Sequence, residues 1–147
     1  MSPRRVAAIS YVPAPSAVKV RFAPVMKASG GLVVGSRVSS VRLGGAVVGA
    51  VGVYATKPGL GRSAMFQDQY VVQLMQSVTK SKASPRFVRM NGRVVALSAG
   101  SVPVAGWFEA DHVVLVYRQS VTPDLPALAL GVLRQSKRAM TPPHFAP

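Results

Sequence analysis

The first 67 residues contain no acidic side chain, and this limits how the chain can fold. They carry nine Lys or Arg residues, and the first carboxylate in the sequence is that of Asp68. A stretch that cannot neutralise itself internally must leave its charge to water and counterions or to a polyanionic partner. We therefore expect these cations to lie on the surface of the folded chain.

The composition indicates a folded body and not a disordered basic tail. The chain has 147 residues and a net charge of +14, yet 49% of its residues are hydrophobic and only 15% are charged. Disordered tails are rich in charge and poor in apolar residues, whereas this chain contains 26 valines, which favour strands. The length suits one domain with a real core. We predict an N-terminal arm over 1–16, a body over 17–138 and a C-terminal arm over 139–147.

Two segments in the first half favour strands. Residues 17–22 alternate apolar and basic side chains, which predicts a strand with Lys19 and Arg21 on its polar face. Residues 32–56 are rich in Val and Gly, as expected for short, bulged strands. Both segments therefore favour a Val-rich sheet.

A membrane segment is the rival interpretation of part of this region. Leu43 to Thr56 is a run without charge between Arg42 and Lys57, and it has two glycines at the GxxxG spacing, Gly45 and Gly49. Crossing a membrane takes about 20 residues, and this run is shorter and built from small side chains. The strand interpretation is favoured, and the membrane alternative stays open.

Two helices are expected, over residues 63–80 and 123–138. In the first, Ser63 is a plausible N-cap, and apolar residues repeat at helical spacing at Phe66, Tyr70, Val71, Leu74, Met75 and Val78. The second is predicted to be capped by Thr122, with Pro123 at its first position and basic residues at its end. Together with the strands they predict an α+β fold with a Val-rich antiparallel sheet, two helices and extended terminal arms.

Asn91-Gly92 between two β-prone runs is a strong hairpin signal, because both residues tolerate a positive φ. A two-residue turn pairs Met90 with Arg93 and Arg89 with Val94, which places cations on both faces of the hairpin. Arg86, Arg89 and Arg93 then lie around its tip, where guanidinium groups match phosphate oxygens.

Few residues of the chain could act in catalysis or bind a metal ion. The chain has no cysteine, two histidines and four carboxylates, and the only cluster of such groups spans Glu109 to His112. Adjacent residues on a tight connection rarely converge on one ion, so we interpret this cluster as a polar turn. We expect no catalysis, no metal and no cofactor. Trp107 and Phe108 are candidates for base stacking, although a core or subunit contact is favoured for them.

The N-terminus has some features of an organellar presequence. Residues 1–22 are free of acid and contain four cations, but Pro3, Pro13 and Pro15 would interrupt the amphipathic helix that import requires. We therefore do not favour a cleaved presequence. The location of the protein is left open between an intracellular ribonucleoprotein, an organelle and a virion.

The sequence favours a structural subunit of a large nucleic-acid-containing assembly, either a ribosomal-type protein or a small viral shell protein. Its partners are expected to be nucleic acid, RNA more than DNA, and neighbouring proteins of the assembly. The alternative is an accessory subunit of a membrane-embedded complex anchored by residues 43–56. The candidate phosphate-binding residues are Arg4, Arg5, Lys19, Arg21, Arg37, Arg42, Arg86, Arg89, Arg93, Arg134, Lys137 and Arg138.

Overall fold

A computed structural model describes residues 9–59, 64–98 and 100–139, excluding the side chains of residues 64 and 136–139. In chain order the elements are β1 (Ile9–Pro13), α1 (Ser16–Phe22), α2 (Pro24–Ala28), β2 (Val33–Leu43), β3 (Ala46–Thr56), α3 (Ala64–Thr79), β4 (Arg86–Met90), β5 (Arg93–Ser98), β6 (Val104–Glu109), β7 (His112–Arg118) and α4 (Leu125–Ala139). The predicted α+β fold with a Val-rich antiparallel sheet is confirmed.

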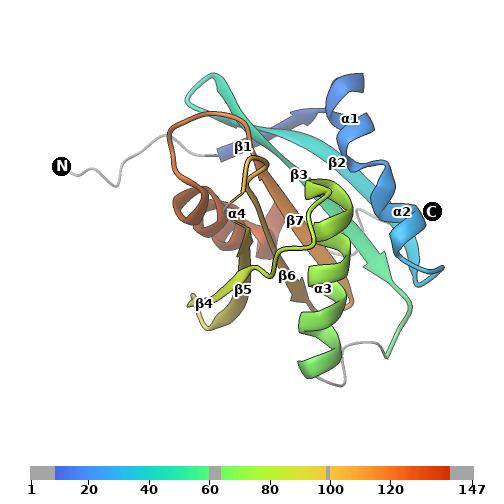
Figure 1. Cartoon of the computed structure of the whole chain (residues 1–147). Helices are drawn as coiled ribbons and strands as arrows, with labels where there is room; N and C mark the ends of the chain where they lie inside the picture. Colours follow the sequence, from blue (N-terminus) through green and yellow to red (C-terminus); the bar gives the residue numbers. More distant parts are fainter. Residues whose placement is uncertain (1–8, 60–63, 99, 140–147) are drawn as a thin grey trace.

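The seven strands form one antiparallel sheet in the order β1-β2-β3-β7-β6-β5-β4. Helices cover both faces of this sheet, with α1, α2 and α3 on one face and α4 on the other (Figure 1). Neighbours in the sheet are mostly neighbours in sequence. The exception is the pairing of β3 with β7. Strand β7 lies between β3 and β6 and so joins the two halves of the sheet.

The segment predicted as a strand over 17–22 is the helix α1, so this prediction was wrong. Val18 and Phe22 are buried, whereas Val20 is 70% exposed. Positions four residues apart share a face of a helix, so Val18 and Phe22 fit helical spacing. The segment as a whole also alternates apolar and basic residues, which is why it resembled a strand. Pro15 directly precedes α1 and Pro24 begins α2, both of which suit helix starts. Neither short helix was predicted.

Residues 9–13, which the sequence analysis assigned to the N-terminal arm, form the edge strand β1 paired with β2. The C-terminal arm lies outside the described residues from residue 140 onward, as do Ser63 and its predicted cap.

The two long helices were predicted well. Helix α3 ends at Thr79, where Lys80 adopts a φ of 62° and donates its backbone N–H to the Gln76 carbonyl. Helix α4 begins two residues later than predicted, because Asp124 and not Thr122 caps it. The Asp124 carboxylate accepts a hydrogen bond from the Ala127 backbone N–H at 2.9 Å.

The run proposed as a membrane anchor comprises the end of β2, a turn and β3. The turn residues Gly44 and Gly45 have φ values of 67° and 114°, a region that favours glycine. Strand β3 pairs with β2 on one side and β7 on the other, and most of its side chains are buried. Among the described residues, no helix is long and apolar enough to cross a membrane.

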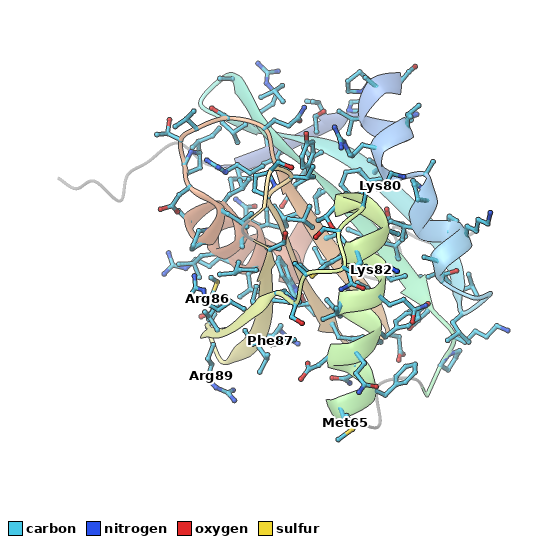
Figure 2. All side chains as sticks on the ribbon, in the orientation of Figure 1. Met65, Lys80, Lys82, Arg86, Phe87 and Arg89 are labelled. Carbon is cyan, nitrogen blue, oxygen red and sulfur yellow. The ribbon has the colours of Figure 1, made fainter. Side chains whose placement is uncertain are left out.

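The hairpin of β4 and β5 has the predicted register, with Met90 opposite Arg93 and Arg89 opposite Val94. Asn91 and Gly92 have positive φ values of 52° and 80°. The pairing places cations on both faces, as predicted. Strand β4 is the last strand of the sheet, so one side of it has no neighbouring strand within the described part of the chain. Figure 2 labels Arg86, Phe87 and Arg89 along it.

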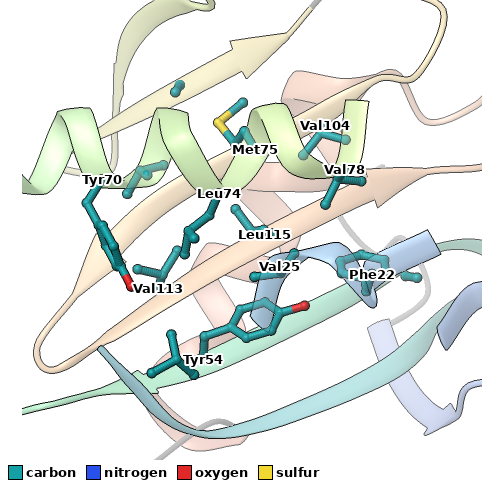
Figure 3. Packing of buried hydrophobic residues seen from close by; sticks show 14 of the residues in the cluster. Phe22, Val25, Tyr54, Tyr70, Leu74, Met75, Val78, Val104, Val113 and Leu115 are labelled. Carbon is teal, nitrogen blue, oxygen red and sulfur yellow. The ribbon is translucent and has the colours of Figure 1, made fainter. Parts of the chain in front are cut away.

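Two apolar cores fill the layers on either side of the sheet. Under α1, α2 and α3, Phe22 and Leu74 pack with sheet residues such as Tyr54 and Leu115 (Figure 3). Under α4, Leu128 and Val132 pack against Val51, Val114 and Trp107. The apolar stripe predicted on the first long helix is therefore core, except for the half-buried Phe66.

Candidate nucleic-acid interface

The fold divides the predicted phosphate-binding residues into those held by internal contacts and those left exposed. Arg42 donates to the Gly45 carbonyl oxygen at 2.8 Å, and Arg93 donates to the Phe108 carbonyl oxygen at 3.0 Å. Arg21 is half-buried, with its guanidinium carbon 5.3 Å from the centroid of the Tyr117 ring. These three side chains stabilise turns and packing, which makes them poorer candidates for phosphate contacts.

The remaining predicted cations with described side chains are exposed. They are Lys19, Arg37, Arg86, Arg89 and Arg134. Arg4 and Arg5 lie outside the described residues, and for Lys137 and Arg138 only the helical backbone of α4 is described.

Lys19 and Arg37 both border a pocket of about 400 Å³ between α1, α2 and β2. They do not form a joint phosphate site, because Arg37 pairs with Val53, whose side chain belongs to the core under α4. Successive side chains of a strand point to opposite faces, so the sheet separates the Arg37 side chain from Lys19.

Four cations follow one another closely in sequence, from the end of α3 through the connection to the edge strand β4. Lys80, Lys82, Arg86 and Arg89 fall within ten residues of sequence, and all four are exposed. Among the described residues, none forms a hydrogen bond or ion pair with these four side-chain cations. We call this group the α3–β4 cation cluster.

The connection that carries the two lysines is held against α3. Gln76 donates its side-chain amide to the carbonyl oxygens of Lys82 at 3.3 Å and Ala83 at 3.4 Å. The Ala83 backbone N–H in turn donates to the Ser81 hydroxyl at 3.1 Å. The polar face of α3 thus forms hydrogen bonds within the chain and fixes the backbone that carries Lys82.

Of these cations, Arg86 and Arg89 were predicted as phosphate contacts around the hairpin tip, whereas Lys80 and Lys82 were not predicted. Phe87 was not singled out, although it is 46% exposed on the edge strand between the two arginines. An aromatic residue between two arginines on a predicted strand is the signal that could have identified it.

The aromatic residues considered for base stacking are buried. Trp107 is 1% exposed and Phe108 is 7% exposed. The Trp107 indole N–H donates to a carboxylate oxygen of Glu109 at 3.0 Å. Both residues therefore serve the core, as the favoured interpretation had it.

The acidic cluster forms the tight turn between β6 and β7. Ala110 has a φ of 53°, and the Asp111 carbonyl oxygen accepts hydrogen bonds from the Thr56 backbone N–H at 2.8 Å and hydroxyl at 2.9 Å. Within the described part of the chain, no group of three or more His, Asp or Glu residues is placed to hold a metal ion. The cluster is a polar turn, as predicted.

His112 in this turn gives the fold a pH dependence. Burial lowers the pKa of its imidazole below the ordinary value of 6.5, and Arg93 acts in the same direction, while Glu109 and Asp111 oppose the shift. Because the unfolded chain then binds a proton more readily, we expect the free energy of unfolding to decrease as pH falls below about 6.5. Urea unfolding between about pH 5 and 7.5 checks this. The decrease is expected to be smaller in His112→Asn, and an equal decrease in both proteins would contradict the assignment.

Comparison with protein-family models, with curated proteins and with solved structures finds no significant match to this chain. What the fold and the site define is an α+β protein with a cation cluster at one free edge of its sheet.

Proposed function

We propose that this chain is a non-catalytic structural subunit of a large nucleic-acid-containing assembly, of the ribosomal type or a small viral shell. It contacts the phosphate backbone through exposed Lys and Arg side chains, and most of these contacts do not depend on the nucleotide sequence. Its protein surfaces contact neighbours in the assembly. RNA is the favoured nucleic acid.

The observation that carries this proposal is a folded body whose exposed cations, where their side chains are described, lack intramolecular partners. The chain has 18 basic side chains and four acidic ones, and the α3–β4 cation cluster groups four of the cations at a free sheet edge. Ordinary solvated surfaces mix the two signs of charge. A surface with a large excess of cations attracts polyanions and gains affinity by releasing the counterions that phosphates condense.

The membrane alternative depends on an anchor at residues 43–56. In the fold these residues belong to β2, a turn and β3, whose side chains are mostly buried in the two cores. No other described feature favours a lipid partner over a nucleic acid, so nucleic acid is the favoured partner.

Binding of the purified full chain to a single-stranded RNA oligonucleotide tests the proposal. Fluorescence anisotropy is expected to show binding at low salt that high salt reverses, because counterion release drives the association. The same chain purified without nuclease is expected to carry nucleic acid that nuclease removes. Absence of RNA and DNA binding at low salt would refute the proposal.

A further inference from the structure

A groove between α3 and β4 lies beside the cation cluster. It has a volume of about 350 Å³, within the range of about 300–1,000 Å³ that ligand pockets have. Its walls are largely apolar: Met65 and Val72 come from α3, and Pro85 and Phe87 come from the connection and β4. Phe87 and Met65 remain 46% and 70% exposed.

The groove follows from how α3 packs. This helix contacts β6 and β5, while its contacts with β4 are few or absent. Phe87 pairs with Ala96, a residue of the core under α3, so its ring lies on the face of the sheet that α3 covers elsewhere. In Figure 2, Phe87 lies between β4 and α3, and Met65 lies at the beginning of the helix. The fold thus leaves an aromatic side chain half-exposed beside an open, apolar space.

We propose that this groove binds an unpaired nucleotide base, which stacks on Phe87 while Lys82 and Arg89 of the α3–β4 cation cluster hold the adjoining phosphates. This inference rests on the proposed function and adds the place of contact and the form of the nucleic acid. Base stacking on aromatic side chains within a positively charged groove is how single strands are bound without strong sequence preference.

The cations are placed to hold phosphates on either side of a stacked base. Arg89 pairs with Val94 and therefore lies on the same face as Phe87, two residues along the strand. Lys82 belongs to the connection that leads to Pro85 on the other wall and is held there by Gln76. Arg86 is on the opposite face at the free edge of the sheet, where its long side chain is exposed.

Asp68 gives the groove one group that repels phosphate. It lies on the α3 wall beside Gln69, in an otherwise basic surface. A carboxylate accepts hydrogen bonds from the exocyclic amino groups of bases, and an amide both donates and accepts. The Asp68 carboxylate therefore favours bases that carry an amino group, such as cytosine, over uracil, whereas the Gln69 amide can bond to either base.

Substitutions at Phe87 test this site by changing stacking without changing charge. Relative to the wild type, we expect Phe87→Ala and Phe87→Leu to bind single-stranded RNA about 10-fold more weakly, within the range of about 5–150-fold that one stacked base is worth. Phe87→Tyr is expected to bind as the wild type does, because it keeps the ring. Binding of duplex RNA should be the same for all four proteins, since paired bases cannot enter the groove. Thermal unfolding of each variant verifies that it folds.

Two further measurements sharpen the test. In Phe87→Trp, RNA should quench the emission of the exposed indole while leaving that of the buried Trp107 unchanged. Asp68→Asn should lower the preference for oligocytidine over oligouridine, because a neutral amide accepts amino hydrogens less strongly than a carboxylate.

Outcomes separate the failure of this site from the failure of the proposed function. If the wild type binds RNA and folded Phe87→Leu binds it equally well, the base site is refuted and the proposed function stands. If the wild type binds neither single-stranded nor duplex RNA, both are refuted. A second copy of the chain, paired along the free edge of β4, is the alternative occupant of this surface. A wild-type dimer in sedimentation that Phe87→Ala dissociates, and that RNA leaves intact, would also refute the base site.

Discussion

Replacing Trp107 with Ala is expected to destabilise the fold by about 3–5 kcal/mol, the range for removing a large aromatic residue from a core. The side chain is 1% exposed and belongs to the core under α4, together with Val114, its cross-strand partner, and Leu128. The substitution also removes the N–H group bonded to Glu109. Because small domains have a total stability of about 5–15 kcal/mol, this one change can remove much of it.

Urea unfolding followed by circular dichroism measures this loss, since the substitution removes the only tryptophan of the chain. Trp107→Phe is the matched control, because it keeps an aromatic ring and loses the hydrogen bond. It is expected to cost less than the Ala variant. Equal stability of the Ala variant and the wild type would show that Trp107 is not in the core.

Neutralising the α3–β4 cation cluster is expected to give the largest loss of RNA affinity. The variant Lys80→Gln, Lys82→Gln, Arg86→Gln and Arg89→Gln lowers the net charge from +14 by four. If each cation neutralises one phosphate of a single strand, the loss at physiological salt is on the order of 100-fold, with a salt slope smaller by about 3. Anisotropy titrations with a single-stranded RNA oligonucleotide measure both quantities.

The control for this variant changes the net charge equally at other exposed positions. These are Lys19, Lys27, Lys57 and Arg134, each replaced by Gln. We expect a smaller loss of affinity, because these cations lie outside the α3–β4 cation cluster and act mainly through the general field of the protein. Equal losses in both variants would mean that the cations act by net charge, without a preferred binding surface.

The sequence predicted the elements that local rules determine. The Asn91-Gly92 turn set the register of β4 and β5, because only a few residue types accept positive φ at both positions. The apolar spacing of α3 and the proline, acid and apolar pattern at the start of α4 placed both helices within two residues of their observed beginnings. These signals lie within one segment each.

Elements decided by the rest of the fold were missed. In α1, Val18, Val20 and Phe22 fit both a strand and a helix, and the choice depends on what Val18 and Phe22 pack against. The insertion of β7 between β3 and β6 is also invisible to local patterns, since it depends on pairing over long separations. Strand β1 was missed for the same reason, because it is defined by its pairing with β2, which is distant in sequence.

The candidate site was predicted only in part for the same reason. Arg86 and Arg89 were identified from the hairpin alone. The groove beside Phe87 exists because α3 packs on β5 and β6, and no pattern within β4 reveals that. Conversely, Arg42 and Arg93 were predicted as phosphate contacts, yet both donate hydrogen bonds to backbone carbonyl oxygens of the chain.

The salt dependence of RNA binding by the unmodified chain tests the central claim most directly. Dissociation constants for a single-stranded RNA oligonucleotide would be measured between about 50 and 200 mM monovalent salt. If the cluster neutralises four phosphates, the logarithm of the association constant should fall linearly with the logarithm of salt concentration, with a slope of about −3 or steeper. A slope near zero, or no binding at the lowest salt, would contradict the account.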